Sequence, residues 1–421
     1  MLETAPDAMP PAFEKWATKY DDIFANQSQR VHFRTYLCGL LGQSPRKNIA
    51  VIAANSVGTS YFNLHHFLHD APWDAQRLND RRIDLIWQTR QTRPAVGFKL
   101  IIDDSGHRKS GSATEGVGRQ YLGQIGKVDN GMVMVTSHIF DGKRGYPLDL
   151  ATYKHASSLK DGKEDAEFKK KPELALELID KCLKRDLKPG LSLIDSGYGN
   201  NTTFLLGLEE RNLKYVASVV GNRKVSIQLE GETKRQKHRL DELAKTIKPE
   251  CFKLITLKLE KPRDVWVTAL QVFVPKLGMR TVTIQFNAST FEAATDICYF
   301  LSNETENIAT AEWMARSYSQ RNWIEVFYRE VKGWLGMTDY QVRDLKSIER
   351  HWHLAFNAFT FLACQRWTGG LQGKYSKWPI STFGDAFKVF NHVLECLMLR
   401  WIPKNFQLFA AHRASQGLIF S

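Results

Sequence analysis

Three carboxylates stand where they could carry chemistry. Asp103 ends the apolar run Phe98–Asp103 and Asp195 ends Leu191–Asp195, whereas Glu325 lies in a segment with helical spacing. Carboxylates at strand ends and on an adjacent helix can meet at one edge of a sheet. Convergent Asp and Glu oxygens suit Mg²⁺ or Mn²⁺, and two such ions can assist an in-line displacement at phosphorus. We therefore predict that these three acids form a catalytic site that holds two Mg²⁺ or Mn²⁺ ions.

Each acid also has an ordinary explanation. An Asp after an apolar strand is often a turn or helix-cap residue, and a lone Glu on a helix is usually solvated. Asp104 is an alternative to Asp103 as the first ligand. Because successive side chains of a strand point to opposite faces, only one of the two should share a site with Asp195. We favour Asp103, which directly follows the apolar run.

The residues around Glu325 favour a phosphate site. In one predicted helix, about Ala309–Leu335, Tyr318, Arg321, Glu325 and Lys332 are separated by three, four and seven residues. At about 100° per residue this spacing keeps all four on one face. Arg can bind a phosphate through two hydrogen bonds, Lys as a point charge and Tyr as a donor. The alternative is a helix with ordinary i,i+4 salt bridges.

These motifs resemble those of the DDE insertion-sequence transposases. The spacing Tyr-(2)-Arg-(3)-Glu-(6)-Lys is the signature of one branch, and this chain matches it at every position. The first and second catalytic motifs of the family resemble Leu100-Ile-Ile-Asp103-Asp-Ser and Leu193-Ile-Asp195-Ser-Gly-Tyr198. The stretch from Asp103 to Asp129, with two N-terminal segments, is similar to insertion-sequence family seven-zero-one. The resemblance covers about residues 25–365.

The resemblance implies both a fold and an activity. Family members have an RNase H-like catalytic core, bind terminal inverted repeats of double-stranded DNA as dimers, cut at the element ends with divalent metal and join the 3′-OH to target DNA. In better-known members of the branch, excision passes through a DNA hairpin and a Trp in a β-rich insertion holds a flipped base. Trp266 is the candidate by location, although a core aromatic in a strand is the alternative. The candidate DNA- or phosphate-binding residues are therefore Tyr318, Arg321, Arg329, Lys332 and Trp266.

Periodicity divides the chain into four parts. Helical spacing in residues 1–95 predicts a helical DNA-binding domain. Residues 96–220 and 308–368 predict an α/β, RNase H-like core with a mixed sheet. Alternation at period two predicts a β-rich insertion at 221–307, and 369–421 is expected to be a C-terminal helical segment for DNA backbone contact or dimerisation.

Within the predicted core, two strands are expected at Tyr121–Val128 and Met132–Phe140. The sequence Asp129-Asn-Gly between them is a strong hairpin signal. The six cysteines are widely spaced, without zinc-finger spacing, and are expected to be buried thiols.

Charge points to a polyanionic partner. The chain of 421 residues has 58 Lys and Arg against 45 Asp and Glu, a net charge of +13. Residues 221–280 hold +7 and 366–421 hold +5, whereas 1–95 are nearly neutral. We expect the basic parts to contact DNA backbone.

Other classes of protein are disfavoured by the sequence. No apolar run is long enough for a membrane span and no secretory signal begins the chain, so we expect a cytoplasmic protein. The resemblance to insertion-sequence transposases implies a bacterial one. No Walker-type loop indicates a nucleotide cofactor. The alternatives to a cut-and-paste transposase are a metal-dependent RNase H-like nuclease without strand transfer and a domesticated, non-catalytic DNA-binding protein.

Overall fold

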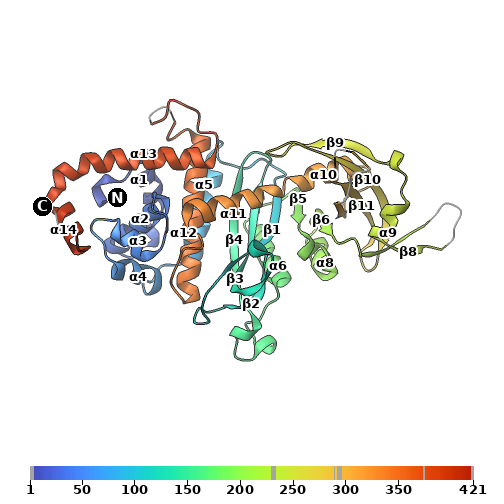
Figure 1. Cartoon of the computed structure of the whole chain (residues 1–421), viewed down its shortest axis with the longest axis horizontal. Coiled ribbons are helices and arrows are strands. Elements are labelled where there is room, and N and C mark those ends of the chain that lie inside the picture. Colours follow the sequence, from blue (N-terminus) through green and yellow to red (C-terminus); the bar gives the residue numbers. More distant parts are fainter. Residues whose placement is uncertain (1–3, 229–233, 289, 292–295, 373–374, 419–421) are drawn as a thin grey trace.

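The computed structural model describes residues 4–228, 234–288, 290–291, 296–372 and 375–418. Figure 1 shows an elongated molecule, in which helices from both ends of the chain gather at one end and a large sheet runs from the middle to the other end. The sheet has twelve strands, with β2-β3-β1-β5-β6-β12-β11-β10-β7-β8 in order, β4 beside β3 and β9 beside β10. The architecture is a mixed α/β fold.

Six strands at one end of the sheet have the arrangement expected of an RNase H-like core. Its strands are β1 Lys99–Arg108, β2 Gly118–Leu122, β3 Lys127–Phe140, β4 Gly145–Tyr153, β5 Leu191–Ile194 and β6 Tyr215–Val219. The strand β1 pairs antiparallel with β3 and parallel with β5, β3 pairs antiparallel with β4, and β5 pairs parallel with β6. The strand β1 is paired with β3 along its whole length and with β5 over Lys99–Ile102, the residues that precede Asp103.

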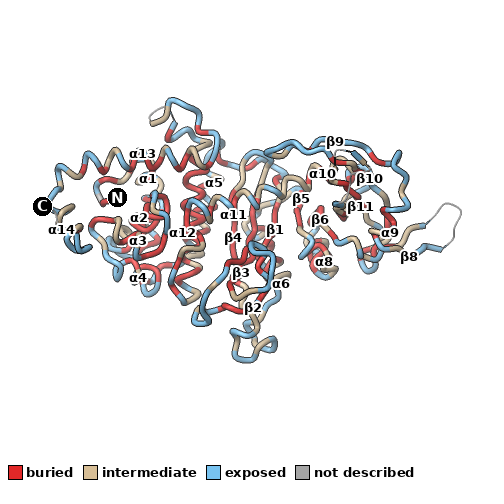
Figure 2. The backbone as a smooth tube through the Cα atoms, in the orientation of Figure 1, coloured by how far each residue is buried: buried red, intermediate tan, exposed pale blue. Residues whose placement is uncertain are grey.

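Helices flank this sheet. They are α6 Lys171–Lys184, α7 Ser196–Gly199, α8 Thr202–Glu210, α10 Ala311–Ser319, α11 Asn322–Leu335 and α12 Leu345–Thr368. Figure 2 shows buried residues concentrated along the central strands and α12, whose residues from Ile348 onward are almost all buried. The helix α12 is therefore the axis against which the sheet and the N-terminal helices pack.

The strands after β6 continue the same sheet. They are β7 Lys224–Ile227, β8 Gln236–Arg239, β9 Lys253–Leu257, β10 Arg263–Val274, β11 Gly278–Phe286 and β12 Ile297–Ser302, with helix α9 Leu240–Thr246. The last of them, β12, pairs antiparallel with β6, so the hydrogen-bonded ladder is continuous from β1 to β8. The strands β7 and β8 and the helix α9 had no counterpart in the sequence-based prediction.

The two ends of the chain pack together. The N-terminal helices are α1 Pro11–Ala17, α2 Gln27–Leu41, α3 Ile49–Ala54, α4 Tyr61–His69 and α5 Ala75–Gln88, and the C-terminal ones are α13 Phe383–Trp401 and α14 Phe406–Ser415. The aromatic ring of Phe13 packs on Phe361 of α12 and Phe390 of α13, with centroids 5.9 and 6.1 Å apart. In the described part of the chain, no helix combines the length and apolar character needed to cross a bilayer.

The predicted hairpin at Asp129-Asn-Gly is wrong. These residues lie inside β3, and the turn between β2 and β3 is at Gly123–Gly126, where Gly126 has φ 65°. Long-range contacts override the local turn preference: Asn130 donates to the backbone oxygen of Lys109, and a Cβ at Gly131 would lie 2.4 Å from the His107 oxygen. Gly131 is therefore required for the close approach of β1, not for a turn.

The single helix predicted for about Ala309–Leu335 is also wrong. The helices α10 and α11 are separate, and between them the Arg321 and Ile324 N–H groups donate to Tyr318 and Arg321 oxygens three residues back. This 3₁₀-type turn changes the angle per residue, so Tyr318 does not share one regular helix face with Glu325.

The edge strand β4 was missed because Pro147 disfavours a strand. In the structure Pro147 lies where the register between β4 and β3 shifts.

All six cysteines are free, but they are not all buried. Cys38, Cys182 and Cys364 are buried, whereas Cys251 is exposed.

Candidate active site

Asp103 and Asp195 follow paired residues on adjacent parallel strands. Ile102 of β1 lies opposite Ile194 of β5, and each acid comes next in the chain. Asp103 is only 6% exposed. Asp195 caps the short helix α7, its Oδ1 accepting the Tyr198 N–H at 3.1 Å. The parallel register therefore brings the two predicted aspartates to the same edge of the sheet.

Arg321 connects the aspartates with Glu325. Its Nη2 lies 2.9 Å from Asp103 Oδ2, and its Nη1 lies 3.6 Å from Glu325 Oε1. Arg321 precedes the first turn of α11, and Glu325 lies within that turn. The 3₁₀-type turn before α11 thus places the guanidinium between one carboxylate from β1 and one from the helix. The Glu325 side chain remains 62% exposed, so it faces solvent at the edge of the group.

The charges of this group are only partly balanced. Burial raises the pKa of Asp103 to about 7; Arg321 opposes this rise, while Asp195, Asp104 and Glu325 add to it. Burial also raises the pKa of Asp195, against the effect of Arg321. Although burial lowers the pKa of Arg321, its acidic neighbours hold it above the ordinary value. One buried cation therefore faces several carboxylates.

The carboxylate oxygens of this group are suitable ligands for a divalent cation. Carboxylate oxygens that repel one another beside a single guanidinium would be stabilised by further positive charge. Within the described ranges, no three His, Cys, Asp or Glu side chains are already arranged as a metal-binding group. The residues that could hold a metal are Asp103, Asp195 and Glu325, with Arg321 now lying between two of them.

Asp104 points elsewhere. Its carboxylate forms an ion pair of 2.5 Å with Lys171 at the start of α6. The alternation along β1 therefore turns the Asp104 side chain away from Asp103. Its negative charge still helps to raise the pKa of Asp103 and of Asp195.

Two of the predicted phosphate-binding residues lie against the group. Tyr318 is packed on Phe300 with ring centroids 4.3 Å apart, and burial raises its pKa to about 12. Lys332 lies two turns beyond Glu325, and its Nζ donates to Gln124 Oε1 at 3.4 Å. Burial lowers the pKa of Lys332, while Glu325 and Asp103 oppose that effect. Lys332 is thus close enough to the acids to be influenced by their charge.

The structure does not bring Arg329 and Trp266 into this group. Arg329 of α11 is exposed, and its Nη2 lies 3.7 Å from Glu260 Oε2. Trp266 lies in β10, where its ring meets Phe291 edge to face at 6.0 Å in a cluster of aromatic side chains. Its Nε1 is buried and has no hydrogen-bond partner among the described residues. The role of Trp266 as a base-holding residue stays a prediction.

A buried polar layer beneath Asp103 was missed by the sequence analysis. Tyr328 of α11 forms a hydrogen bond with Thr136 of β3, and the Thr136 hydroxyl also lies 3.4 Å from the Asp103 backbone oxygen. His138 Nε2 lies 2.7 Å from the same hydroxyl. The polar residues Thr136 and His138, two positions apart on one face of β3, could have indicated this layer, which connects α11 to the strand that carries Asp103.

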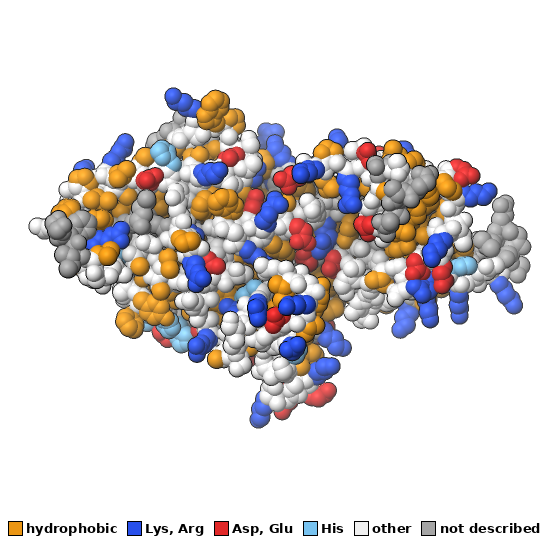
Figure 3. All heavy atoms as spheres, in the orientation of Figure 1, with side chains coloured by type: hydrophobic (Ala, Val, Ile, Leu, Met, Phe, Trp, Pro, Cys, Tyr) orange, Lys and Arg blue, Asp and Glu red, His pale blue; other side chains and the backbone are white. Residues whose placement is uncertain are grey.

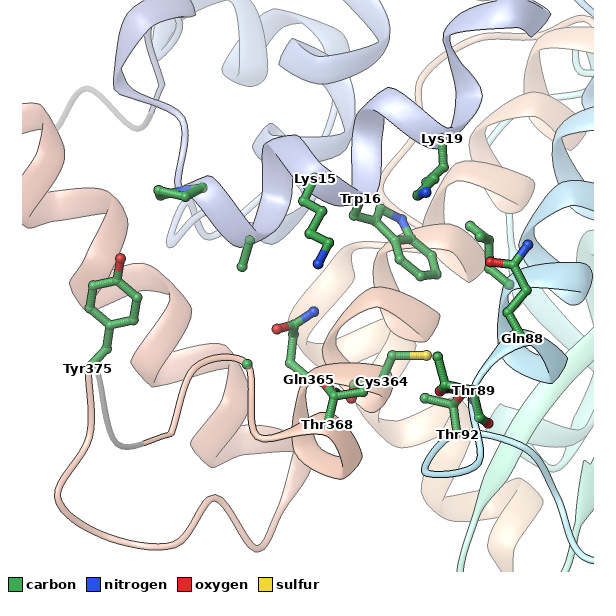
Figure 4. Close-up of a pocket in the computed structure, with 14 residues that line it drawn as sticks. Lys15, Trp16, Lys19, Gln88, Thr89, Thr92, Cys364, Gln365, Thr368 and Tyr375 are labelled. Atoms are coloured by element: carbon green, nitrogen blue, oxygen red, sulfur yellow. Dashed lines mark hydrogen bonds between the residues drawn. The ribbon is translucent and has the colours of Figure 1, made fainter.

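A separate pocket of about 530 Å³ lies between α1, α5 and α12 (Figure 4). In Figure 4, Lys15 and Trp16 point into it from one side and Gln365 from the other. None of the carboxylates of the candidate site lines this pocket, so it belongs to the packing of the N-terminal helices.

Comparison with known proteins shows the family to which this chain belongs. The family described as DDE superfamily endonuclease matches residues 19–269, which include Asp103 and Asp195 but not Glu325. A probable transposase for insertion sequence element IS701 from Microchaete diplosiphon is 28% identical over 352 residues, 83% of this chain and 87% of the relative.

Among solved structures, a piggyBac transposase synaptic complex with hairpin DNA covers 93% of this chain and 77% of its own, with 10% identity and a TM-score of 0.44. The family match spans more than half of the chain and includes both strand-end aspartates. This chain belongs to the DDE superfamily endonucleases, and it is a transposase of that superfamily.

Proposed function

We propose that this transposase binds the terminal inverted repeats of an insertion sequence, cleaves the DNA at the element ends and joins the freed 3′-OH to target DNA. The observation that supports the proposal most is the register of β1 and β5, which puts Asp103 and Asp195 next to each other with Arg321 linking Asp103 to Glu325. The DDE superfamily depends on divalent metal, and the carboxylates suit that requirement.

In this proposal Asp103, Asp195 and Glu325 hold two Mg²⁺ or Mn²⁺ ions. When bound, the ions supply activation of the attacking oxygen and stabilisation of the leaving oxygen. Asp103 must be deprotonated to act as a metal ligand. Because its pKa is about 7, metal binding is expected to depend on pH near neutrality. Arg321 lowers that pKa and so favours the ionised form.

The remaining residues position the DNA. Arg321 and Lys332 contact backbone phosphates beside the scissile bond, Tyr318 donates a hydrogen bond, and the exposed Arg329 contacts the backbone at the rim. Trp266 is proposed to hold a flipped base, which requires its ring to leave the aromatic cluster.

We assign roles to the parts of the chain as follows. Residues 1–95 bind DNA through helices, 96–220 and 308–368 form the catalytic core, 221–307 form the β-rich insertion, and 369–421 contact DNA or a second copy. Two copies pair on the element ends as a homodimer. Because the substrate is chromosomal DNA, the reaction takes place in the cytoplasm of a bacterium.

Separate assays of end binding and end cleavage test the proposal. Asp195→Asn and Glu325→Gln should each reduce metal-dependent cleavage to background while leaving binding of the end duplex within a few fold of the unaltered protein. Asp180→Asn removes a partly exposed acid of α6 that pairs with Arg211; it is the control and should cleave normally. Full cleavage by both site variants would refute the assignment.

A second assay separates transposition from simple hydrolysis. Pre-cleaved ends with a free 3′-OH are incubated with a target plasmid and divalent metal. A transposase yields joined products, whereas a nuclease of the same fold yields only cut DNA.

A further inference from the structure

One face of β1 continues beyond the carboxylates toward a lysine. Asp103, Ser105 and His107 are buried on this face, and Lys109 follows them directly after the strand. On α11, which covers the same region, Glu325 and Lys332 are seven residues apart, or about 10 Å along the axis. Both rows therefore begin with an acid and end with a lysine.

The backbone of Lys109 is held in place by Asn130. Its N–H donates to the Asn130 backbone oxygen at 3.0 Å, and its oxygen accepts from Asn130 Nδ2 at 2.8 Å. These two bonds explain why Asn130 lies inside a strand. They also mean that the position of Lys109 is fixed relative to β1 and β3.

The side chain of Lys109 lies on an aromatic ring. Its Nζ is 3.5 Å from the centroid of Tyr340 and 3.5 Å from the Tyr340 backbone oxygen. Among the described residues no carboxylate lies within ion-pairing distance of this ammonium. Burial lowers the pKa of Lys109 to about 8. A half-buried ammonium in this environment is stabilised by an anion.

Lys332 has a comparable environment. Its ammonium lies 5.5 Å from the Tyr328 ring centroid and is hydrogen-bonded only to the Gln124 amide among the described residues. Burial and the charges of both lysines lower the pKa of His107, so this histidine is neutral, with Nε2 2.6 Å from the Tyr340 hydroxyl. The two lysines therefore approach the same buried, uncharged histidine from different elements.

We propose that Lys109 extends the phosphate contacts of Lys332 and binds a phosphate of the DNA backbone farther from the scissile phosphate. The proposal rests on the proposed function, because it takes transposon-end DNA as the ligand. Lys332 binds the nearer phosphate and Lys109 the farther one. Both lysines lie on the same side of the carboxylates, so they define the direction in which the strand leaves the site.

The geometry limits which phosphate Lys109 can reach. Lys109 is six residues beyond Asp103 along an extended chain, which corresponds to about 20 Å. With about 3.4 Å per base pair, this distance spans about six base pairs of duplex. The contact is therefore expected within about six nucleotides of the cleavage position.

The first test compares Lys109→Gln with Arg108→Gln. Arg108 is the adjacent residue, but its side chain is 70% exposed and pairs with Asp129, so it is the matched control. Binding of the end duplex is measured at several salt concentrations without metal. Losing one phosphate contact should reduce the slope of log K against log salt by about 0.9 in Lys109→Gln and leave it unchanged in Arg108→Gln. Lys109→Arg should restore most of the slope, and thermal unfolding verifies that each variant folds.

The second test locates the contact. Single neutral methylphosphonates replace each phosphate within eight nucleotides of the cleavage position. One replacement should weaken binding by the unaltered protein and have no further effect on Lys109→Gln, since both changes remove the same contact. Two results would overturn the proposed site. One is an equal slope of log K against log salt for Lys109→Gln and Arg108→Gln. The other is that, at every phosphate, the effect of the methylphosphonate on binding adds to that of Lys109→Gln. Failure of the unaltered protein to bind or cut the end duplex would instead refute the proposed function.

Discussion

Replacing Asp103 with Asn should change how the stability of the protein depends on pH. The carboxyl of Asp103 is 6% exposed, and its pKa is raised from 3.8 to about 7, mainly by burial. Because the folded state then binds a proton more tightly than the unfolded state, the free energy of unfolding falls as pH rises from about 4 to 7. A difference of about three pKa units at about 1.4 kcal/mol each gives a decrease of about 4 kcal/mol. The variant cannot titrate at this position, so its dependence should be flatter by that order of magnitude.

Urea unfolding followed by tryptophan fluorescence at pH 4 to 8, with chelator present, measures this difference. Asp180→Asn is the control: hydrogen bonds from Arg211 lower the pKa of Asp180, so its stabilisation is lost only as pH falls below about 3.8. The control should therefore follow the unaltered protein throughout the measured range. If Asp103→Asn also follows the unaltered protein, the acid is not held at a raised pKa, and the reasoning from its burial among carboxylates is wrong.

Two further predictions concern the sheet. Gly131→Ala should lower the free energy of unfolding by about 1 to 3 kcal/mol in urea, since the new Cβ would lie 2.4 Å from a backbone oxygen of β1, whereas Gly123→Ala, with no atom within 4 Å, should have little effect. Exposed basic side chains gather along the edge of the molecule near β8 (Figure 3). Charge reversal of Lys224 and Lys237 should weaken DNA binding in a gel-shift titration more than two reversals within residues 1–95; the opposite ranking would contradict a role of this edge in backbone contact.

The positions of the aspartates could be predicted because they depend on local patterns. An apolar run followed by an acid specifies both a buried strand and the residue at its end. Pairing of β1 with β5 was the remaining requirement, and an α/β order of elements makes it the expected one. The proposed Asp103 and Asp195 site therefore needed little information beyond the sequence.

The turn between α10 and α11 could not be predicted in the same way. Nothing local breaks the helical pattern there, since no Pro or Gly is present. The Arg321 guanidinium pairs with Asp103, more than two hundred residues earlier in the chain, and that contact accompanies the 3₁₀-type turn. Similarly, Asn130 and Gly131 look like a hairpin turn in isolation, but in the sheet they bind Lys109 and make room for β1.

The continuous ladder from β5 to β8 sets a length scale for the molecule. Six strand spacings of about 4.8 Å separate β5, which precedes Asp195, from β8, so the two are about 29 Å apart along the sheet. Hydrogen bonds fix each spacing, so the sheet would set a constant distance between the proposed catalytic site and any DNA bound near β8. Adding or removing one strand would shift that reach by about one and a half base pairs, so relatives with different numbers of strands in this region are expected to measure element ends of different length.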